Sequence, residues 1–319
     1  MFISFKLDFA SSWITACAMG AALVFGGCSA AEDDGDATPA LDPSDPAGIA
    51  GSLVPVPLED SEDDELATVS QPIMGGVESV NSATTYLSFE PGYGNSGICS
   101  GVAVSKFHIL TAAHCIQTEG WTRAMVWRKY CNSSSCSYSA ILDSNIWLYA
   151  QRHPDFTGAG DNGDDLAMLT IYHIYDDGVS LPEPSSYAMR IWLGSLGSGS
   201  QLSVWGWGAN TWANTGTGFL RTTTQVVSSS YTNYFTAVVG SSSTCRGDSG
   251  GPAIVGGNKV AGLVSAGDGD PCTPTGGNNY YSRLKSKMGW IEAQMQYPFG
   301  MDFSCNRYSS GSSLYARCW

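Results

Sequence analysis

Three short segments of this chain supply a hydroxyl, an imidazole and a carboxylate in settings that suit catalysis. The hydroxyl is that of Ser249, within Gly-Asp-Ser-Gly-Gly-Pro at 247–252, and the imidazole is that of His114, within Thr-Ala-Ala-His-Cys at 111–115. The carboxylate is that of Asp165, directly before the apolar run Leu-Ala-Met-Leu. A serine hydroxyl is a weak nucleophile at its ordinary pKa, so it needs a neighbouring base and a third group that orients the base. The three segments supply one group of each kind.

The order His, Asp, Ser and the residues around each resemble the chymotrypsin-like (trypsin-family) serine proteases, in which this triad is well described. The order differs from those of the subtilisins and the α/β-hydrolases. The resemblance implies that Ser249 is the nucleophile, that His114 acts as general base and then acid, and that Asp165 orients His114. It also implies an oxyanion hole formed by the backbone N–H groups of Gly247 and Ser249, where glycine allows the close approach that such a donor needs.

Asp164 directly precedes Asp165 and is the competing candidate for the catalytic carboxylate. The family pattern places that carboxylate immediately before the apolar run, which favours Asp165. The remaining histidines, His108, His153 and His173, have no such context, and we expect them to be ordinary strand or loop residues.

Two glycine-containing segments extend the resemblance. Gly-Trp-Gly at 206–208 is similar to a segment of the family, and Ser-Ala-Gly at 265–267 resembles the Ser-Trp-Gly edge that pairs with substrate backbone. The second segment implies substrate contacts at Ser265 and Gly267. Ala266 stands where the family has an aromatic residue, so we expect a thinner wall there.

The segment Ile-Met-Gly-Gly at 73–76 is similar to the Ile-Val-Gly-Gly start of the mature enzymes. The resemblance implies that an activating protease cleaves before Ile73 and that the new ammonium group pairs with Asp248. Pro72 precedes the junction and no basic residue lies beside it, so a trypsin-like activator is not expected. Without cleavage, the resemblance implies a disordered oxyanion loop and an inactive protein.

The resemblance also implies the residues of the specificity pocket, counted back from Cys245 and aligned with the family's pocket strand at 278–281. Ser243 would lie at the pocket base with Thr244 beside it, and Asn279 would stand where the family often has glycine. Trypsin-like enzymes keep an aspartate at the base to balance a Lys or Arg side chain of the substrate. Its absence here predicts cleavage after uncharged residues of small to medium size.

The ten cysteines favour an oxidising compartment. Cys17 and Cys28 lie in the leader, and the other eight suit four disulfides. The resemblance implies the first two of the following pairs, and proximity along the chain suggests the other two: Cys99–Cys115, Cys245–Cys272, Cys131–Cys136 and Cys305–Cys318. No C-x-x-C pair or histidine has zinc-ligand spacing, and an aspartate-rich stretch at 161–164 lacks the glutamate of a calcium loop, so we expect no metal or cofactor.

Residues 1–28 read as an export signal, with one lysine and an apolar stretch from Trp13 to Gly27 that is short for a membrane span. The ending Phe-Gly-Gly-Cys resembles a bacterial lipobox, in which Cys28 would carry lipid and tether the protein to a membrane. Ser-Ala-Ala at 29–31 also allows ordinary signal cleavage and free secretion. Both alternatives predict an exported protein.

The net charge of −14 is concentrated in one segment. Residues 29–72 contain twelve Asp and Glu and no Lys or Arg, whereas residues 73–319 contain sixteen acidic and fourteen basic residues. Such an acidic, apolar-poor segment cannot bury enough surface to fold, so we interpret 29–72 as an extended tether or propeptide. The charge therefore says nothing about the substrate, and no nucleic-acid partner is expected.

The remaining pattern predicts an all-β fold. Short apolar runs separated by Gly, Ser and Asn are typical of barrels: 101–104, 108–112, 202–205, 252–255 and 259–265. One helix is expected at 284–296, where apolar residues recur every three or four positions. The resemblance implies two Greek-key β-barrels, about 73–183 and 184–283, in a protease domain at 73–296, with a disulfide-closed tail at 297–319.

Two functions of different classes are compatible with this sequence. The first is an exported serine endopeptidase that acts on protein or peptide substrates. The second is a non-catalytic binding lipoprotein on a protease scaffold, because fold alone does not establish function. The complete set of Ser249, His114 and Asp165 favours the first, and the Pro72–Ile73 junction would favour the second if it is never cut.

Overall fold

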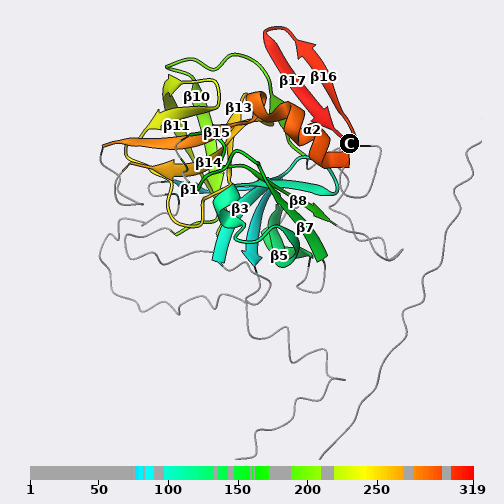
Figure 1. Cartoon of the computed structure of the whole chain (residues 1–319). Helices are drawn as coiled ribbons and strands as arrows, with labels where there is room; N and C mark the ends of the chain where they lie inside the picture. Colours follow the sequence, from blue (N-terminus) through cyan, green and yellow to red (C-terminus); the bar gives the residue numbers. More distant parts are fainter. Residues whose placement is uncertain are drawn as a thin grey trace, which may run out of the picture. The chain divides into compact units, whose positions relative to one another are not determined.

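The computed structural model describes most of the chain from Ile73 onward (Figure 1). The described residues are 73, 76–81, 83–89, 97–131, 136–142, 147–158, 160, 162–171, 188–209, 219–268, 276–296 and 303–319, with backbone alone for 129–131 and 136–142. The expected leader with Cys28, the acidic segment 29–72 and the expected boundary between the barrels at 183–184 all lie outside this set.

Six antiparallel strands close the first barrel. In their order around it they are β2 (Thr84–Phe89), β3 (Gly97–Ala103), β4 (His108–Thr111), β8 (Ala167–Ile171), β7 (Trp147–Arg152) and β5 (Gly120–Cys131). β5 pairs back onto β2, with Leu87 opposite Val126, and this pairing closes the barrel. Both side chains are fully buried in the barrel core. A further strand, β6 (Cys136–Leu142), pairs with β5 outside the ring.

Six more antiparallel strands close the second barrel. Their order is β13 (Pro252–Val255), β10 (Gln201–Gly206), β11 (Arg221–Ser230), β12 (Tyr234–Val238), β15 (Asn278–Arg283) and β14 (Lys259–Gly267), and β14 pairs back onto β13. The short β1 (Val77–Glu78) pairs with β11. Phe235 and Tyr281 stack inside this barrel with ring centroids 5.0 Å apart. Closure leaves neither ring of strands with an open edge.

A third apolar cluster lies between the barrels and the C-terminal helix. It combines Val102 and Met168 of the first barrel with Leu263 of the second and Ile291 of the helix. The helix expected at 284–296 begins as a 3₁₀ turn, η2 (Leu284–Lys287), and continues as α2 (Met288–Gln296). Its expected apolar face is buried at Leu284, Met288, Ile291 and Met295. The two barrels and the helix therefore share one packed joint.

The C-terminal tail adds two strands to the second sheet. β9 (Arg190–Trp192) pairs in parallel with β14, β17 (Ser313–Cys318) pairs with β9, and β16 (Cys305–Ser310) forms the outer edge. A disulfide joins Cys305 to Cys318, as the sequence suggested, and Figure 1 shows the hairpin in red. Among the described residues, no helix has the length and apolar character that a membrane crossing requires.

Candidate active site

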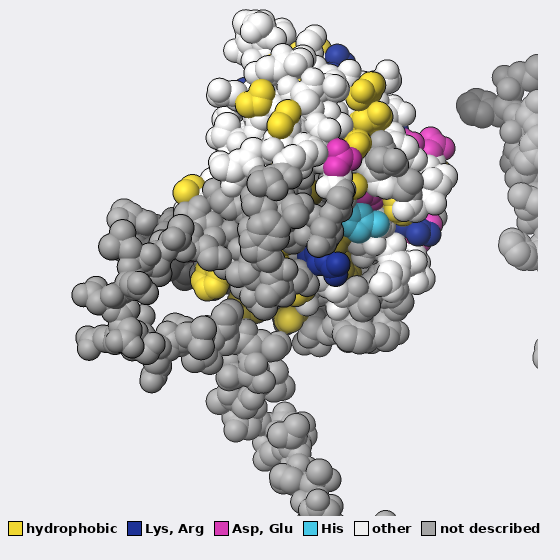
Figure 2. All heavy atoms as spheres, turned by 90° about the vertical axis from the view of Figure 1, so that its left-hand side faces the viewer, with side chains coloured by type: hydrophobic (Ala, Val, Ile, Leu, Met, Phe, Trp, Pro, Cys, Tyr) yellow, Lys and Arg dark blue, Asp and Glu magenta, His cyan; other side chains and the backbone are white. Residues whose placement is uncertain are grey.

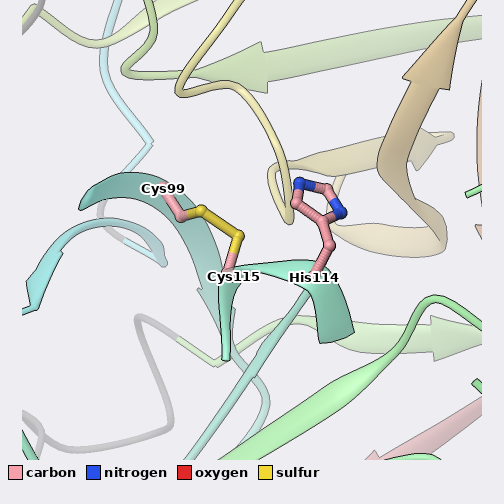
Figure 3. A group of neighbouring side chains, drawn as sticks. All are labelled: Cys99, His114 and Cys115. Atoms are coloured by element: carbon pink, nitrogen blue, oxygen red, sulfur yellow. A yellow bond between two sulfur atoms is a disulfide. The ribbon is translucent and has the colours of Figure 1, made fainter. Parts of the chain in front are cut away.

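His114 lies just beyond the end of a strand of the first barrel. β4 ends at Thr111, and the 3₁₀ turn η1 (Ala113–Cys115) follows and carries the histidine. A disulfide from Cys115 to Cys99 of β3 braces this turn, as the resemblance implied, with the two Cα atoms 6.3 Å apart. In Figure 3 the imidazole ring is directed away from the disulfide. The His114 side chain is 38% exposed, so its ring is fixed at the base and open at the tip.

Asp165 is the carboxylate that meets His114. Its Oδ2 is 2.7 Å from His114 Nδ1, and its Oδ1 accepts a hydrogen bond of 2.8 Å from the His114 backbone N–H. The hydroxyl of Ser265 donates a third bond of 2.5 Å to Oδ2. A buried carboxylate needs such donors to remain stable. With the Nδ1 proton held by Asp165, the exposed Nε2 of His114 is left as a proton acceptor.

Asp164 takes a different partner. Its Oδ1 bonds to Nζ of Lys287 at the end of η2, whereas the carboxylate bonded to His114 is that of Asp165. The structure therefore brings the second of the two neighbouring aspartates, Asp165, to the imidazole.

Ser249 lies in a tight turn between β12 and β13. Gly247 has φ +92° and Gly250 has φ +80°, a region that residues with side chains rarely adopt. A Cβ atom at Gly250 would lie 2.2 Å from Oγ1 of Thr111, so this glycine also allows close contact with the strand that leads to His114. These two glycines explain the local sequence around the serine.

Ser100 of β3 holds the same turn from the first barrel. Its backbone N–H donates to the Ser249 carbonyl (2.8 Å), and its hydroxyl donates to the Gly247 carbonyl (2.8 Å). The hydroxyl oxygen also accepts a bond of 3.0 Å from the backbone N–H of Trp207. Ser100 was not among the residues expected at the site, because nothing near it in the sequence marks this role.

His114, Gly247 and Ser249 line one cavity of about 240 Å³ at the protein surface. Phe89 and Ile98 form part of its wall. Within the described part of the chain, the backbone N–H groups of Gly247 and Ser249 have no protein acceptor. Figure 2 shows a histidine side chain, in cyan, at the molecular surface. Among the described histidines, only His114 is exposed.

Asp248 is fully buried and is not one of the residues that line this cavity. Its carboxylate accepts bonds from the backbone N–H groups of Gly208 (2.8 Å) and Cys245 (2.7 Å). Burial raises the pKa of Asp248 to about 7, although these two bonds act in the opposite direction. No ion pair to Asp248 is present within the described ranges. A Cβ atom at Gly206 would lie 2.0 Å from Asp248 Oδ1, so glycine there makes room for the carboxylate.

Ile73 is already inside the second barrel. Its side chain is fully buried in the cluster that contains Tyr281, and its φ of +36° is a strained value for a β-branched residue. Burial first, and then the charge of Asp248, raise the pKa of Tyr281. Ile73 thus lies in the same buried cluster as Tyr281, on which the charge of Asp248 acts.

The residues expected in the specificity pocket also come together. Ser243, Thr244 and Asn279 are all buried. The Thr244 hydroxyl donates to Asn279 Oδ1 at 3.0 Å, and the Ser243 hydroxyl points to the same oxygen at 3.4 Å. Their side chains thus form one uncharged, hydrogen-bonded group. Gly267 lies opposite Asn279 in the ladder between β14 and β15.

The Ser265 side chain bonds within the protein, which differs from the expected role in substrate binding. The resemblance implied a substrate contact, but the hydroxyl bonds to Asp165 and to the Gly160 carbonyl (2.6 Å). Only the backbone of Ser265 is left to meet a substrate.

The other two expected disulfides lie partly outside the described residues. Cys245 is disulfide-bonded, and Cys272 is outside the described set. Cys131 and Cys136 stand opposite each other in the β5–β6 ladder, and their side chains are not described.

Two groups of side chains within the described residues have donor atoms close enough for a metal ion. In the first, around His114, both sulfur atoms belong to the Cys99–Cys115 disulfide. In the second, formed by His153, Asp155 and Asp164, the ammonium of Lys287 is bonded to Asp164. Neither group is therefore a set of free ligands.

Comparisons with known proteins agree with this geometry. Residues 73–291 match the protein-family model described as Trypsin. The chain is 26% identical to trypsin I-P1 of Gallus gallus over 264 residues, which cover 77% of this chain and 96% of that protein. It is 25% identical to a chymotrypsin of Phaedon cochleariae over 273 residues, covering 78% and 94%. It is also 26% identical to melanization protease 1 of Drosophila melanogaster over 271 residues, covering 69% and 64%.

Proposed function

Because this chain belongs to the trypsin family of serine proteases, we propose that it is an endopeptidase whose acyl-enzyme forms on Ser249. One observation supports the proposal above all. The buried Asp165 holds Nδ1 of His114, while the imidazole lines the same cavity as Ser249. The arrangement supplies a nucleophile, a base and the group that orients the base.

The chemistry follows from these positions. Nε2 of His114 takes the proton of the Ser249 hydroxyl as Oγ bonds to the substrate carbonyl carbon. The carbonyl oxygen becomes negative and is met by the N–H groups of Gly247 and Ser249, which have no acceptor within the described residues. The carbon–nitrogen bond then breaks, and His114 returns the proton to the leaving amine. Water attacks the ester by the same route and restores the serine.

The proposed substrates are proteins or peptides with an uncharged residue before the cut bond. The proposed pocket residues Ser243, Thr244 and Asn279 carry hydroxyl and amide groups and no carboxylate, and they are hydrogen-bonded to one another. A buried Lys or Arg side chain there would lack a negative partner, which is costly. Asn279 also takes volume that glycine would leave free.

A peptide library tests this preference and the roles of the three residues together. We expect cleavage after small to medium uncharged residues, lost in the Ser249→Ala and His114→Ala variants. A profile dominated by Arg or Lys would contradict the pocket assignment. Cleavage that persists in both variants would contradict the assignment of the catalytic residues.

We further propose that cleavage of the Pro72–Ile73 bond activates the enzyme. Ile73 belongs to the buried cluster that contains Tyr281, and the charge of Asp248 acts on Tyr281, which supports the proposal that a new ammonium group at Ile73 pairs with Asp248. The alternative is a non-catalytic binding protein that is never cut. The complete arrangement at Ser249 and His114 favours the enzyme, since a binding role does not require it.

We propose that this protein is exported, either with lipid on Cys28 or after ordinary signal cleavage. Mass spectrometry of the mature N-terminus separates the two forms. A lipid-modified Cys28 would establish a membrane tether, whereas an unmodified terminus near Glu32 would establish free secretion.

A further inference from the structure

A buried ion pair lies directly behind the candidate catalytic carboxylate. Asp164 immediately precedes Asp165, and its Oδ1 bonds to Nζ of Lys287. The side chains of Lys287 and Asp164 are only 6% and 13% exposed. Removing two charges from water is costly, so a pair in this place is not explained by stability alone.

No other group in the described surroundings neutralises Asp164. His153 packs its ring 5.2 Å from that of Trp290, and its pKa is lowered by burial first and then by the charge of Lys287. The lowered pKa disfavours the charged form of His153, although the charges of Asp164 and Asp155 act in the opposite direction. Asp155, whose side chain is 73% exposed, adds a further negative charge on the same connection. Within the described ranges, Lys287 is the cation that pairs with Asp164.

The two neighbouring aspartates are both held by the second barrel. The hydroxyl of Ser282, in β15, donates a buried bond of 2.9 Å to the Asp165 carbonyl. Lys287 follows in η2 and bonds to the Asp164 side chain. The connection that leads into β8 of the first barrel is thus attached to one continuous stretch of the second.

We propose that Lys287 is a positioning residue for the catalytic centre. It cancels the charge of Asp164, so that Asp165 alone provides the negative field at His114, and it holds the segment that carries both aspartates. The charges that face this site are those of Asp155, Asp164 and Asp165 on the β7–β8 connection, His114 on η1 and Lys287 on η2. The proposal rests on the proposed function, but its electrostatic part can be measured without turnover.

The test uses the full-length Ser249→Ala protein and follows the titration of the His114 ring by NMR. We expect Lys287→Met to raise the midpoint by roughly 0.5 pH unit, because an unbalanced Asp164 favours the protonated ring. Asp164→Asn should lower it by a similar amount, and the double variant should return it to that of the parent. Lys285→Met, an exposed neighbour in the same turn, is the matched control and should not move it.

Activity provides the second readout, in the protein with Ser249 intact. In each variant, the acid limb of the pH profile of kcat/KM should move in the same direction as the His114 midpoint. Lys287→Arg should leave the acid limb where the parent has it, because that substitution keeps the charge. The proposal would be overturned if Lys287→Met and Asp164→Asn move the His114 midpoint no more than the control does. It would also be overturned if both variants move the midpoint in the same direction. If Lys287→Met does not fold, the shift in Asp164→Asn decides the question. An inactive parent would contradict the proposed function and leave the NMR result readable.

Discussion

At the level of single residues, the hydroxyl of Ser265 supports Asp165, the proposed catalytic carboxylate. Ser265 donates to the oxygen that also holds His114 Nδ1, so its loss weakens the hold on a buried charge. A hydrogen bond to a charged group contributes about 1.5 to 3 kcal/mol. Its removal should therefore cost less than the removal of the carboxylate itself.

We predict that Ser265→Ala lowers kcat/KM roughly tenfold, which corresponds to a loss of about 1.4 kcal/mol of transition-state stabilisation. Steady-state kinetics on one peptide substrate measures the effect. Ser286→Ala removes an exposed hydroxyl that donates to the Arg283 carbonyl and is the control. Equal activity of the two variants would show that Asp165 does not need its third donor.

Asp248 gives a prediction about pH and stability. Because burial raises its pKa from 3.8 to about 7, the folded, uncut protein keeps a proton that the unfolded chain releases between these values. The contribution of this group to the free energy of unfolding should therefore fall as pH rises from about 4 to about 7. The total loss is on the order of 4 kcal/mol, at 1.36 kcal/mol per pKa unit.

Denaturant unfolding of the uncut Ser249→Ala protein, with and without Asp248→Asn, measures this loss at several pH values. The variant should lack the dependence, so the difference between the two curves should widen toward neutral pH. The comparison is needed because His108 acts in the opposite direction: burial lowers its pKa to about 4, and its contribution is lost as pH falls through that value. Parallel curves would mean that the Asp248 carboxyl is ionised or differently solvated.

Among the secondary-structure elements, the C-terminal hairpin extends the second sheet beyond its closed ring of strands. β9 pairs with β14 outside the closed ring, and β17 covers the other side of β9. Ala316, Cys305 and Cys318 are buried in the cluster shared by the two barrels and the helix. The hairpin is therefore part of the packed joint, although it lies beyond the match to the family model, which ends at 291.

We predict that replacing Cys305 and Cys318 together by Ala lowers the free energy of unfolding by about 2 to 4 kcal/mol, because the disulfide closes a chain of 13 residues. kcat/KM on a peptide should change less than about twofold, since no residue of the hairpin lines the cavity at Ser249. Thermal unfolding and kinetics check the two parts separately. A large loss of activity in a folded variant would give the hairpin a direct role at the active site.

For the molecule as a whole, the sequence was most informative where one short segment must meet several structural requirements, such as a tight turn and close packing. The residues around Ser249 and His114 must fit tight turns and close contacts, so their identities could be recognised, and the structure brings them to one cavity. The helix was also recognisable from its apolar spacing, apart from its 3₁₀ start.

The contacts between the barrels could not be predicted in this way. Ser100 meets Gly247 across 147 positions, and Lys287 meets Asp164 across 123. A serine or lysine at either place satisfies no local rule, and only folding brings its partner near. The hairpin was expected as a tail because its pairing partner β9 is a three-residue strand without a clear pattern.

We propose above all that Ser249 is an activated nucleophile and that cleavage before Ile73 activates the protein. The most direct measurement treats the purified protein and its Ser249→Ala variant with a fluorophosphonate probe while the N-terminus is sequenced. We predict labelling of Ser249 in the form that begins at Ile73 and none in the variant. A correctly cut protein that takes up no probe would contradict the account and favour a binding scaffold. Labelling of a protein still uncut at Pro72 would contradict the proposed activation.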